Sequence, residues 1–224
     1  MRGITLRGRG GVFCAGGDLK AFKSEFQASA SLDDVKELSK GAAVLFDAVY
    51  DAPQVTVAVV EGAAVAGGFG MMCCADVVIA AEDVKFAMTE AMLGISPAQI
   101  SPFVVKRLGV SKGRRLMLTG ERVTAAEALE IGLVDFLAPD AAGLGAIEAR
   151  LKKQILKGAP GVAGATKALV RDGERLDRDA FVDRAAEVFA RQLQSDEARE
   201  GVASFFEKRP PSWAPASDAK GKDR

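Results

Sequence analysis

The chain has 224 residues, with 30 basic and 30 acidic side chains, and therefore a formal net charge of zero. It contains no histidine, which excludes Ser-His-Asp and Cys-His nucleophile systems and His-ligated metal sites. Any proton transfer must then use a carboxylate, Lys, Tyr, Cys or a backbone dipole. The balanced charge argues against nucleic acid or an anionic membrane as a partner, and the length is sufficient to bury a hydrophobic core.

The elements expected from hydrophobic periodicity alternate between strands and helices up to about residue 138 and are helices alone after it. The run 55–60 is β-branched and apolar, as a buried strand should be. Thr124 and Glu127 have the capping-box pattern of a helix start. The expected strands are 4–6, 55–60, 77–80, 86–88 and 134–137; the expected helices are 33–50, 67–75, 102–108, 111–118, 128–131, 145–156, 160–170, 178–193 and 196–206.

The change of pattern near residue 139 predicts the domain organisation. We expect an α/β core over residues 1–138, built from strand–helix–strand units with right-handed crossovers. A helical region over residues 139–209 follows, and we expect it to pack on a neighbouring subunit. Residues 210–224 are rich in Pro, Ala, Lys and Asp and are expected to form a flexible tail.

Three cysteines, Cys14, Cys73 and Cys74, lie in apolar stretches. They lack the spacing of a metal site and are too few for a disulfide framework, which favours reduced thiols in a cytoplasmic protein. Residues 1–11 are polar and basic, unlike a signal peptide, and no apolar run reaches the length of a membrane span. We therefore expect a cytoplasmic protein with no membrane partner.

Two glycine-rich loops, residues 13–20 and 62–70, each follow an expected strand. The second lacks the Lys-Ser/Thr pair of a phosphate loop and the third glycine of a dinucleotide fingerprint, which argues against a nucleotide fold. Glycine allows a ligand to approach a backbone N–H group closely. It equally allows tight packing of a strand against a helix, and the spacing alone leaves both interpretations open.

The same loops carry a family resemblance. Residues 13–20 (Phe-Cys-Ala-Gly-Gly-Asp-Leu-Lys), 61–76 and 86–97 resemble, in order, three signatures of the crotonase (enoyl-CoA hydratase/isomerase) superfamily, and the similarity continues to Arg209. The resemblance implies an α/β spiral of ββα units with two roughly perpendicular sheets and a C-terminal helical trimerisation region. It also implies an acyl-CoA substrate, a homotrimer or dimer of trimers, no metal, and no cofactor apart from the CoA of the substrate.

By position, the resemblance assigns an oxyanion hole to the N–H groups of Gly17 and Gly67 and the acid/base role to Glu90. Because Glu90 lies between apolar stretches, desolvation should raise its pKa and suit it to proton exchange. The alternative is a surface salt-bridge residue. The substrate-binding residues that the resemblance implies are Ala15, Gly17, Asp18, Leu19, Ala66, Gly67, Gly68, Thr89, Glu90, Gly94 and Pro97.

Two features depart from the family pattern. Gly70 stands where the best-known hydratases have a second glutamate, and the stretch 94–102 is similar to that of hydratases of branched or glutaconyl-type CoA esters. Family members also begin a few tens of residues earlier, so we expect this chain to lack the opening strands and a loop that helps to hold CoA. Lys208 and Arg209 are candidates for contacts with a neighbour's CoA, with solvated helix-end charges as the alternative.

The leading hypothesis is a hydro-lyase that adds water to a 2-enoyl-CoA thioester, with a branched or glutaconyl-type acyl chain. The first alternative is a Δ3-Δ2 enoyl-CoA isomerase, in which Glu90 alone moves a proton between two carbons. The second, non-enzymatic alternative is a truncated paralogue that binds acyl-CoA without turnover.

Overall fold

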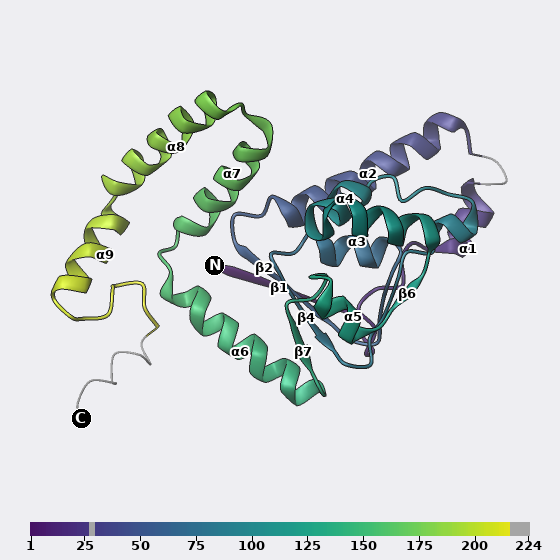
Figure 1. The fold of residues 1–224 in the computed structure, drawn as a ribbon, viewed down its shortest axis with the longest axis horizontal. Coiled ribbons are helices and arrows are strands. Elements are labelled where there is room, and N and C mark those ends of the chain that lie inside the picture. Colours follow the sequence, from purple (N-terminus) through teal and green to yellow (C-terminus); the bar gives the residue numbers. More distant parts are fainter. Residues whose placement is uncertain (27–29, 216–224) are drawn as a thin grey trace. The chain divides into compact units, whose positions relative to one another are not determined.

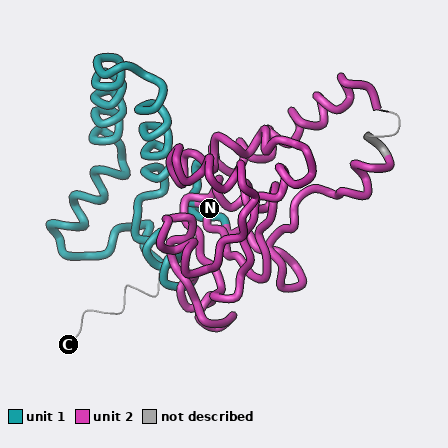
Figure 2. The backbone as a smooth tube through the Cα atoms, turned by 45° about the vertical axis from the view of Figure 1, so that its right-hand side comes forward, with its two compact units in different colours: residues 1–4, 52–55, 149–224 teal, residues 5–51, 56–148 magenta. Residues whose placement is uncertain are grey.

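The computed structural model describes residues 1–26 and 30–215, with the side chains described except at 25 and 26. The chain forms two compact units, coloured separately in Figure 2. The smaller unit comprises Met1–Ile4, Ala52–Val55 and Ala149–Arg224, and the larger unit comprises Thr5–Asp51 and Thr56–Glu148. Part of the expected flexible tail, residues 216–224, lies outside the described residues.

The strands form two sheets, which confirms the expected α/β class. The first has the order β1-β2-β4-β7, and β4 pairs in parallel with both β2 and β7. In the second, of order β3-β5-β6, β3 and β5 are parallel and β5 and β6 antiparallel. The bounds are β1 Gly3–Arg7, β2 Val55–Val60, β3 Ala63–Val65, β4 Val77–Ala81, β5 Lys85–Ala87, β6 Arg122–Val123 and β7 Phe136–Ala138.

The helices of the larger unit begin and end where local chemistry dictates. Ser31 and Asp34 form a capping box at the start of α2, and Thr124 and Glu127 form the predicted one at α5. A non-helical Gly109 (φ 75°, ψ 165°) divides α4, which agrees with the two helices expected there. The bounds are α1 Leu19–Ala21, the π-helical turn η1 Phe22–Phe26, α2 Leu32–Tyr50, α3 Gly67–Cys73, the 3-10 helix η2 Glu90–Leu93, α4 Ser101–Thr119 and α5 Ala125–Glu130. Helix α6 Ala141–Lys157 has residues in both units.

The core of the larger unit lies between the parallel strands and helix α3, which runs beneath α4 in Figure 1. Strands covered on both faces must be apolar throughout, and β2 and β4 are almost entirely buried. Arg107 on α4 fastens the neighbouring segments, since Nε donates to Leu133 O (2.8 Å) and Nη1 to Ala75 O (3.2 Å). These contacts hold the segment that follows α3 and the segment before β7 against α4.

The smaller unit contains the expected C-terminal helices, α7 Val162–Arg175, α8 Arg178–Leu193 and α9 Asp196–Phe206. Several large apolar side chains on them are exposed, among them Phe189, Phe205 and Phe206. The segment after α9 is held at Trp213, whose indole N–H donates to Lys157 O (3.2 Å). In the described part of the chain no helix is both long and apolar enough to cross a membrane.

The structure differs from expectation at the short elements. Residues 62–70, expected to be a small-residue turn, include strand β3 before α3 begins. This strand has only three residues, and its pairing with β5 defines it more than its own sequence does. The two-residue β6 and the short helices α1, η1 and η2 also lacked a sequence signal.

Candidate active site

The two glycine-rich loops, distant in sequence, lie side by side. The N–H of Cys14 donates to Ala63 O (3.1 Å), and the carbonyl of Cys14 accepts from Val65 N–H (3.0 Å). The first loop therefore forms an isolated parallel β-bridge to β3, between Cys14 and Ala64, and reaches the start of α3. The approach is so close that a Cβ on Gly16, whose φ is +97°, would lie 3.6 Å from Gly67 N.

Gly17 and Gly67 supply backbone donors that the fold leaves unused. Gly67 is the first residue of α3, where helix N–H groups have no intrahelical acceptor. Within residues 1–26 and 30–215, neither the Gly17 nor the Gly67 N–H donates a hydrogen bond to the protein. The structure thus brings together the loops of the two predicted oxyanion-hole residues, with both N–H groups available.

Gly68 and Gly70 have a different role, which is packing. A Cβ on Gly68 would lie 2.2 Å from the carbonyl oxygen of Cys14, and one on Gly70 would lie 2.2 Å from Ile100 Cγ2. Both distances are far below van der Waals contact, so a side chain at either position would displace its neighbour. The packing interpretation of the glycines therefore applies to Gly68 and Gly70, whereas the N–H groups of Gly17 and Gly67 have no acceptor among the described residues.

Glu90 is a buried carboxyl group, with 7% of its surface exposed. Its Oε2 has no hydrogen-bond partner among the described residues, which contradicts the alternative of a surface salt bridge. Burial raises the pKa of Glu90 above its ordinary value, because desolvation disfavours the charged form. A raised pKa brings the charged and neutral forms of a carboxyl group closer in free energy at the pH of most reactions, which favours proton exchange.

A backbone hydrogen bond connects the Glu90 segment to the glycine loops. Strand β5 ends at Ala87, three residues before Glu90, and the carbonyl of Ala87 accepts from Ala66 N–H (2.9 Å). Ala66 immediately precedes Gly67. One hydrogen bond thus ties the strand that leads to the carboxyl group to the residue just before the one that carries a free donor.

The other residues predicted around the first loop lie beside Gly17 in the chain. Asp18 caps α1, since Oδ1 accepts from Lys20 N–H (2.9 Å) and Ala21 N–H (3.1 Å). The Asp18 carboxylate therefore holds the loop's own helix. Ala15 and Leu19 are exposed and contribute no such contact.

The residues predicted after Glu90 follow it along the chain. Thr89 precedes η2 without a side-chain cap, and Gly94 ends it in the left-handed region (φ 75°). Pro97 is half-buried, and its carbonyl accepts from Ser101 N–H (3.0 Å) at the start of α4. The hydrogen bonds of Gly94 and Pro97 thus hold their own segment rather than the glycine loops.

Ile100 is a residue of this region that the sequence reasoning missed. It is buried at the start of α4, with its side chain against Gly70. No sequence signal connects an isoleucine at a helix start with a glycine on another helix. The contact follows only from the packing of α4 on α3.

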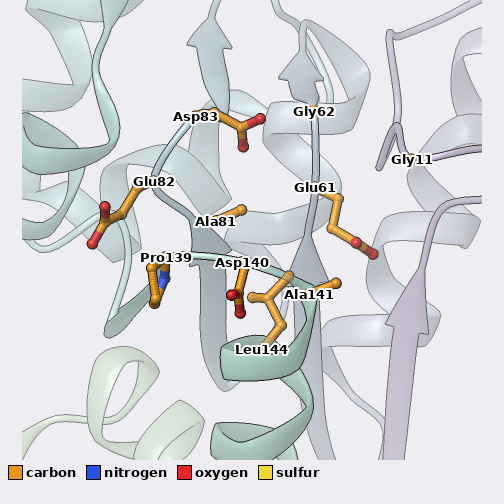
Figure 3. A pocket seen from close by; sticks show the side chains of 10 residues that line it. All are labelled: Gly11, Glu61, Gly62, Ala81, Glu82, Asp83, Pro139, Asp140, Ala141 and Leu144. Carbon is orange, nitrogen blue, oxygen red and sulfur yellow. The ribbon is translucent and has the colours of Figure 1, made fainter.

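A cavity of about 590 Å³ lies elsewhere in the larger unit, at the carboxyl ends of β2, β4 and β7 (Figure 3). Its acidic lining residues are Glu61, Glu82, Asp83 and Asp140. Two of these carboxylates have partners already: Glu61 pairs with Arg7 (3.4 Å), and Asp140 accepts from the N–H of Gly143 (2.8 Å). None of the predicted site residues lines this cavity. In the ranges that the structure covers, no group of three or more Cys, Asp or Glu is placed to hold a metal ion.

The cysteines on α3 are buried rather than reactive. Burial raises the pKa of Cys73 to about 12 and raises that of Cys74 as well. Since the thiolate is the nucleophilic form, neither side chain is suited to covalent catalysis.

Arg209, a candidate for CoA contacts, is engaged within its own unit. Its guanidinium forms a two-pronged pair with Glu200 (2.6 and 2.8 Å) and also contacts Glu207 (2.5 Å). These contacts hold the segment that follows α9 against the helix, which favours a structural role for this arginine.

Known proteins share this architecture. A family model described as enoyl-CoA hydratase/isomerase matches residues 1–216. EchA19 of Mycobacterium tuberculosis, named as an enoyl-CoA hydratase, is 33% identical over 218 residues, which are 95% of this chain and 79% of that protein. The structure of Pseudomonas aeruginosa AtuE is similar with a TM-score of 0.91 and 42% identity, over 96% of this chain and 82% of that one. An enoyl-CoA hydratase/isomerase from Marinobacter aquaeolei gives a TM-score of 0.90 at 37% identity, over 96% and 83% of the two chains. With its fold and its signatures in agreement, the chain belongs to the enoyl-CoA hydratase/isomerase family of the crotonase superfamily.

Proposed function

We propose that the protein is a hydro-lyase that adds water across the double bond of a 2-enoyl-CoA thioester with a branched or glutaconyl-type acyl chain. The observation that carries this proposal is the buried Glu90 carboxyl group, whose Oε2 has no partner among the described residues. It lies on a segment tied directly to a loop with a free N–H donor. Burying a carboxyl group that lacks a partner for one of its oxygens is costly, and such a cost is expected where chemistry requires the group.

The backbone donors act on the thioester. When water adds to the β-carbon, electrons move through the double bond and negative charge develops on the thioester oxygen. The N–H groups of Gly17 and Gly67 are available to donate to that oxygen. Donors fixed in advance stabilise such charge strongly, and removing one typically costs about 2.7–4 kcal/mol of transition-state stabilisation.

Glu90 handles the protons. As the carboxylate it accepts a proton from the attacking water, whose oxygen bonds to the β-carbon. The resulting carboxylic acid then gives a proton to the α-carbon, which collapses the enolate and restores the carboxylate. A single group therefore completes the addition without a net change in its protonation, and its raised pKa makes it a stronger base than an exposed glutamate.

The single carboxylate also bears on the substrate. Where two glutamates orient the water together, the substrate need not supply a further hydrogen-bond acceptor. Here position 70 is glycine, and the side chain of Ile100 fills the adjacent space. A carboxylate on a glutaconyl-type acyl chain supplies the missing acceptor. Branched dicarboxylic enoyl-CoA esters should therefore turn over with a higher kcat/KM than crotonyl-CoA, and equal or faster turnover of crotonyl-CoA would refute this choice of substrate.

A second candidate, Δ3-Δ2 enoyl-CoA isomerase, is favoured by the same observation. One carboxyl group is enough to remove a proton from C2 of a 3-enoyl-CoA and return it to C4. Incubation in H₂¹⁸O separates the two reactions, because hydration places the label in a 3-hydroxyacyl-CoA and isomerisation does not. Binding of acyl-CoA without either product would support the non-enzymatic alternative instead.

The decisive variant is Glu90→Gln, with Glu130→Gln on an exposed helix end as the matched control. We expect kcat to fall about 10²–10⁴-fold for the first and to stay within two-fold for the second. Glu90→Gln should also be the more stable protein at neutral pH. The folded pKa of Glu90 is raised from 4.5, so ionisation of Glu90 opposes folding as pH increases above that value. Full activity in Glu90→Gln would end the proposed mechanism.

The assembly forms part of the proposal. The exposed apolar side chains of Phe189, Phe205 and Phe206 support a homotrimer, or a dimer of trimers, formed through the helical region. Sedimentation velocity would reveal the mass of three or six chains. Turnover should require no added cofactor and should be unaffected by EDTA.

A further inference from the structure

The residue between β3 and α3 has an unusual backbone conformation. Ala66 has φ 51° and ψ −122°, a region that a residue with a Cβ rarely adopts. Over residues 1–26 and 30–215, the only other non-glycine residue with positive φ is Lys208. Such conformations persist where the surrounding structure imposes them.

Three contacts hold Ala66 in this conformation, and each comes from a different element. Its N–H donates to Ala87 O (2.9 Å) at the end of β5, and its carbonyl accepts from Gly70 N–H (3.1 Å) within α3. Its methyl group lies against the first glycine loop, where a Cβ on Gly16 would be only 3.1 Å from it. The backbone of Ala66 is therefore held at its N–H and at its carbonyl, and its side chain is held by the first glycine loop.

The ψ angle of Ala66 sets the plane of the peptide that joins it to Gly67. That peptide carries the Gly67 N–H, so the direction of this N–H follows from the strained angle. If Ala66 relaxed to an ordinary β or α conformation, the peptide plane would turn and the donor would point elsewhere.

We infer that Ala66 is a positioning residue, whose positive-φ backbone directs the Gly67 N–H at the thioester carbonyl of the acyl-CoA substrate. The inference rests on the proposed function, because it requires the Gly67 N–H to be an oxyanion donor. It adds the reason why this donor is aligned before substrate arrives. The hydrogen bond to Ala87, on the strand that leads to Glu90, also sets the donor and the carboxyl group on one connected backbone.

The test compares two substitutions that differ in their access to positive φ. Ala66→Val introduces a β-branched side chain that strongly disfavours φ near 50°, whereas Ala66→Gly removes the penalty. Ala126→Val, at an exposed position of α5, is the matched control. The readouts are kcat, KM, the melting temperature, and the infrared carbonyl band of bound butyryl-CoA carrying ¹³C at the thioester, which cannot be hydrated.

For Ala66→Val we expect kcat to fall about 10²–10³-fold, as for the loss of one oxyanion donor, with KM changed less than five-fold. The carbonyl band, shifted to lower wavenumber in the wild type, should move back toward its position in water. Ala66→Gly should melt a few degrees higher than the wild type, keep the shifted band, and lose less than ten-fold in kcat.

The outcomes separate the two proposals. If the wild type hydrates enoyl-CoA and shifts the carbonyl band but Ala66→Val behaves like Ala126→Val, the positioning role is wrong and the proposed function stands. If the wild-type band itself does not shift, the oxyanion donor is wrong, and the role of Ala66 falls with it. If Ala66→Val does not fold, Ala66→Gly decides: a lower melting temperature or an unshifted band would overturn the inference.

Discussion

The contact between Gly70 and Ile100 predicts that two substitutions will compensate each other. Gly70→Ala adds a methyl group in α3, and Ile100→Gly removes the whole side chain, including its Cβ, from the same space. The added Cβ would lie 2.2 Å from Ile100 Cγ2 and 2.4 Å from its Cβ. The second atom is the branch point of the side chain, so rotation of the isoleucine cannot relieve the overlap and the start of α4 must move.

The expected changes in the free energy of unfolding combine helix propensity, overpacking and cavity formation. Gly70→Ala gains about 1 kcal/mol in helix propensity but incurs about 1–3 kcal/mol of overpacking. Ile100→Gly removes the whole side chain from a buried site, which should cost no less than an Ile→Ala change, about 2–5 kcal/mol. In the double variant the new methyl group enters the vacated space, so the overpacking term disappears and the propensity gain remains. The expected coupling is therefore about 1–3 kcal/mol in favour of the double variant.

The assay is urea denaturation of the wild type, the two single variants and the double variant. Gly41→Ala is the control, because it lies within α2 and a Cβ there would meet nothing within 4 Å. It should stabilise the protein by about 0.5–1 kcal/mol. For independent sites, the changes in unfolding free energy of the two single variants sum to that of the double variant within about 0.5 kcal/mol. Such additivity here would refute the proposed steric conflict. The same conflict predicts that a glutamate placed at position 70 is tolerated only when Ile100 is also made small.

Three further predictions concern stability and reactivity. Lys208 has φ 54° in a Schellman motif at the end of α9, so Lys208→Gly should stabilise the protein by about 0.5–1 kcal/mol in thermal denaturation. Hydrogen bonds from Arg209 lower the pKa of Glu200 from 4.5 to about 2; the stability from this pair is present above pH 4.5 and is lost as pH falls toward 2. The melting temperature of Glu200→Gln should accordingly fall less than that of the wild type over this range, and an identical fall would contradict the pairing. Because burial raises the pKa of Cys73 and Cys74, the native protein should react with DTNB at no more than one thiol, and the unfolded protein at all three.

The features that could be predicted from the sequence are those that depend on residues close together in the chain. The capping box at Thr124 and Glu127 and the break of α4 at Gly109 are local events, and both are found where they were expected. The burial of Glu90 was also foreseeable, because apolar residues flank it on both sides. In each case the pattern and its physical cause lie within a few residues.

Other features depend on segments far apart in the chain, and no local pattern encodes them. Strand β3 is short and exists through its pairing with β5 and the bridge to Cys14. The glycines look alike in the sequence, yet they have different surroundings. A Cβ on Gly68 would collide with a carbonyl oxygen, whereas a Cβ on Gly67 would make only an ordinary van der Waals contact. The positive φ of Ala66 is likewise imposed by three separate elements, and alanine itself gives no hint of it.

The way the site is assembled has a consequence for how the protein can be altered. Its donors are backbone N–H groups, and the loops that carry them are joined through the backbone atoms of Cys14, Ala66 and Ala87. Truncating an exposed side chain nearby, such as Leu19, leaves these bonds in place, so it should affect the fit of the substrate more than the alignment of the donors. Substitutions that change which φ angles are allowed act directly on that alignment. Backbone conformation, rather than side-chain identity, is therefore the property that must be preserved around this site.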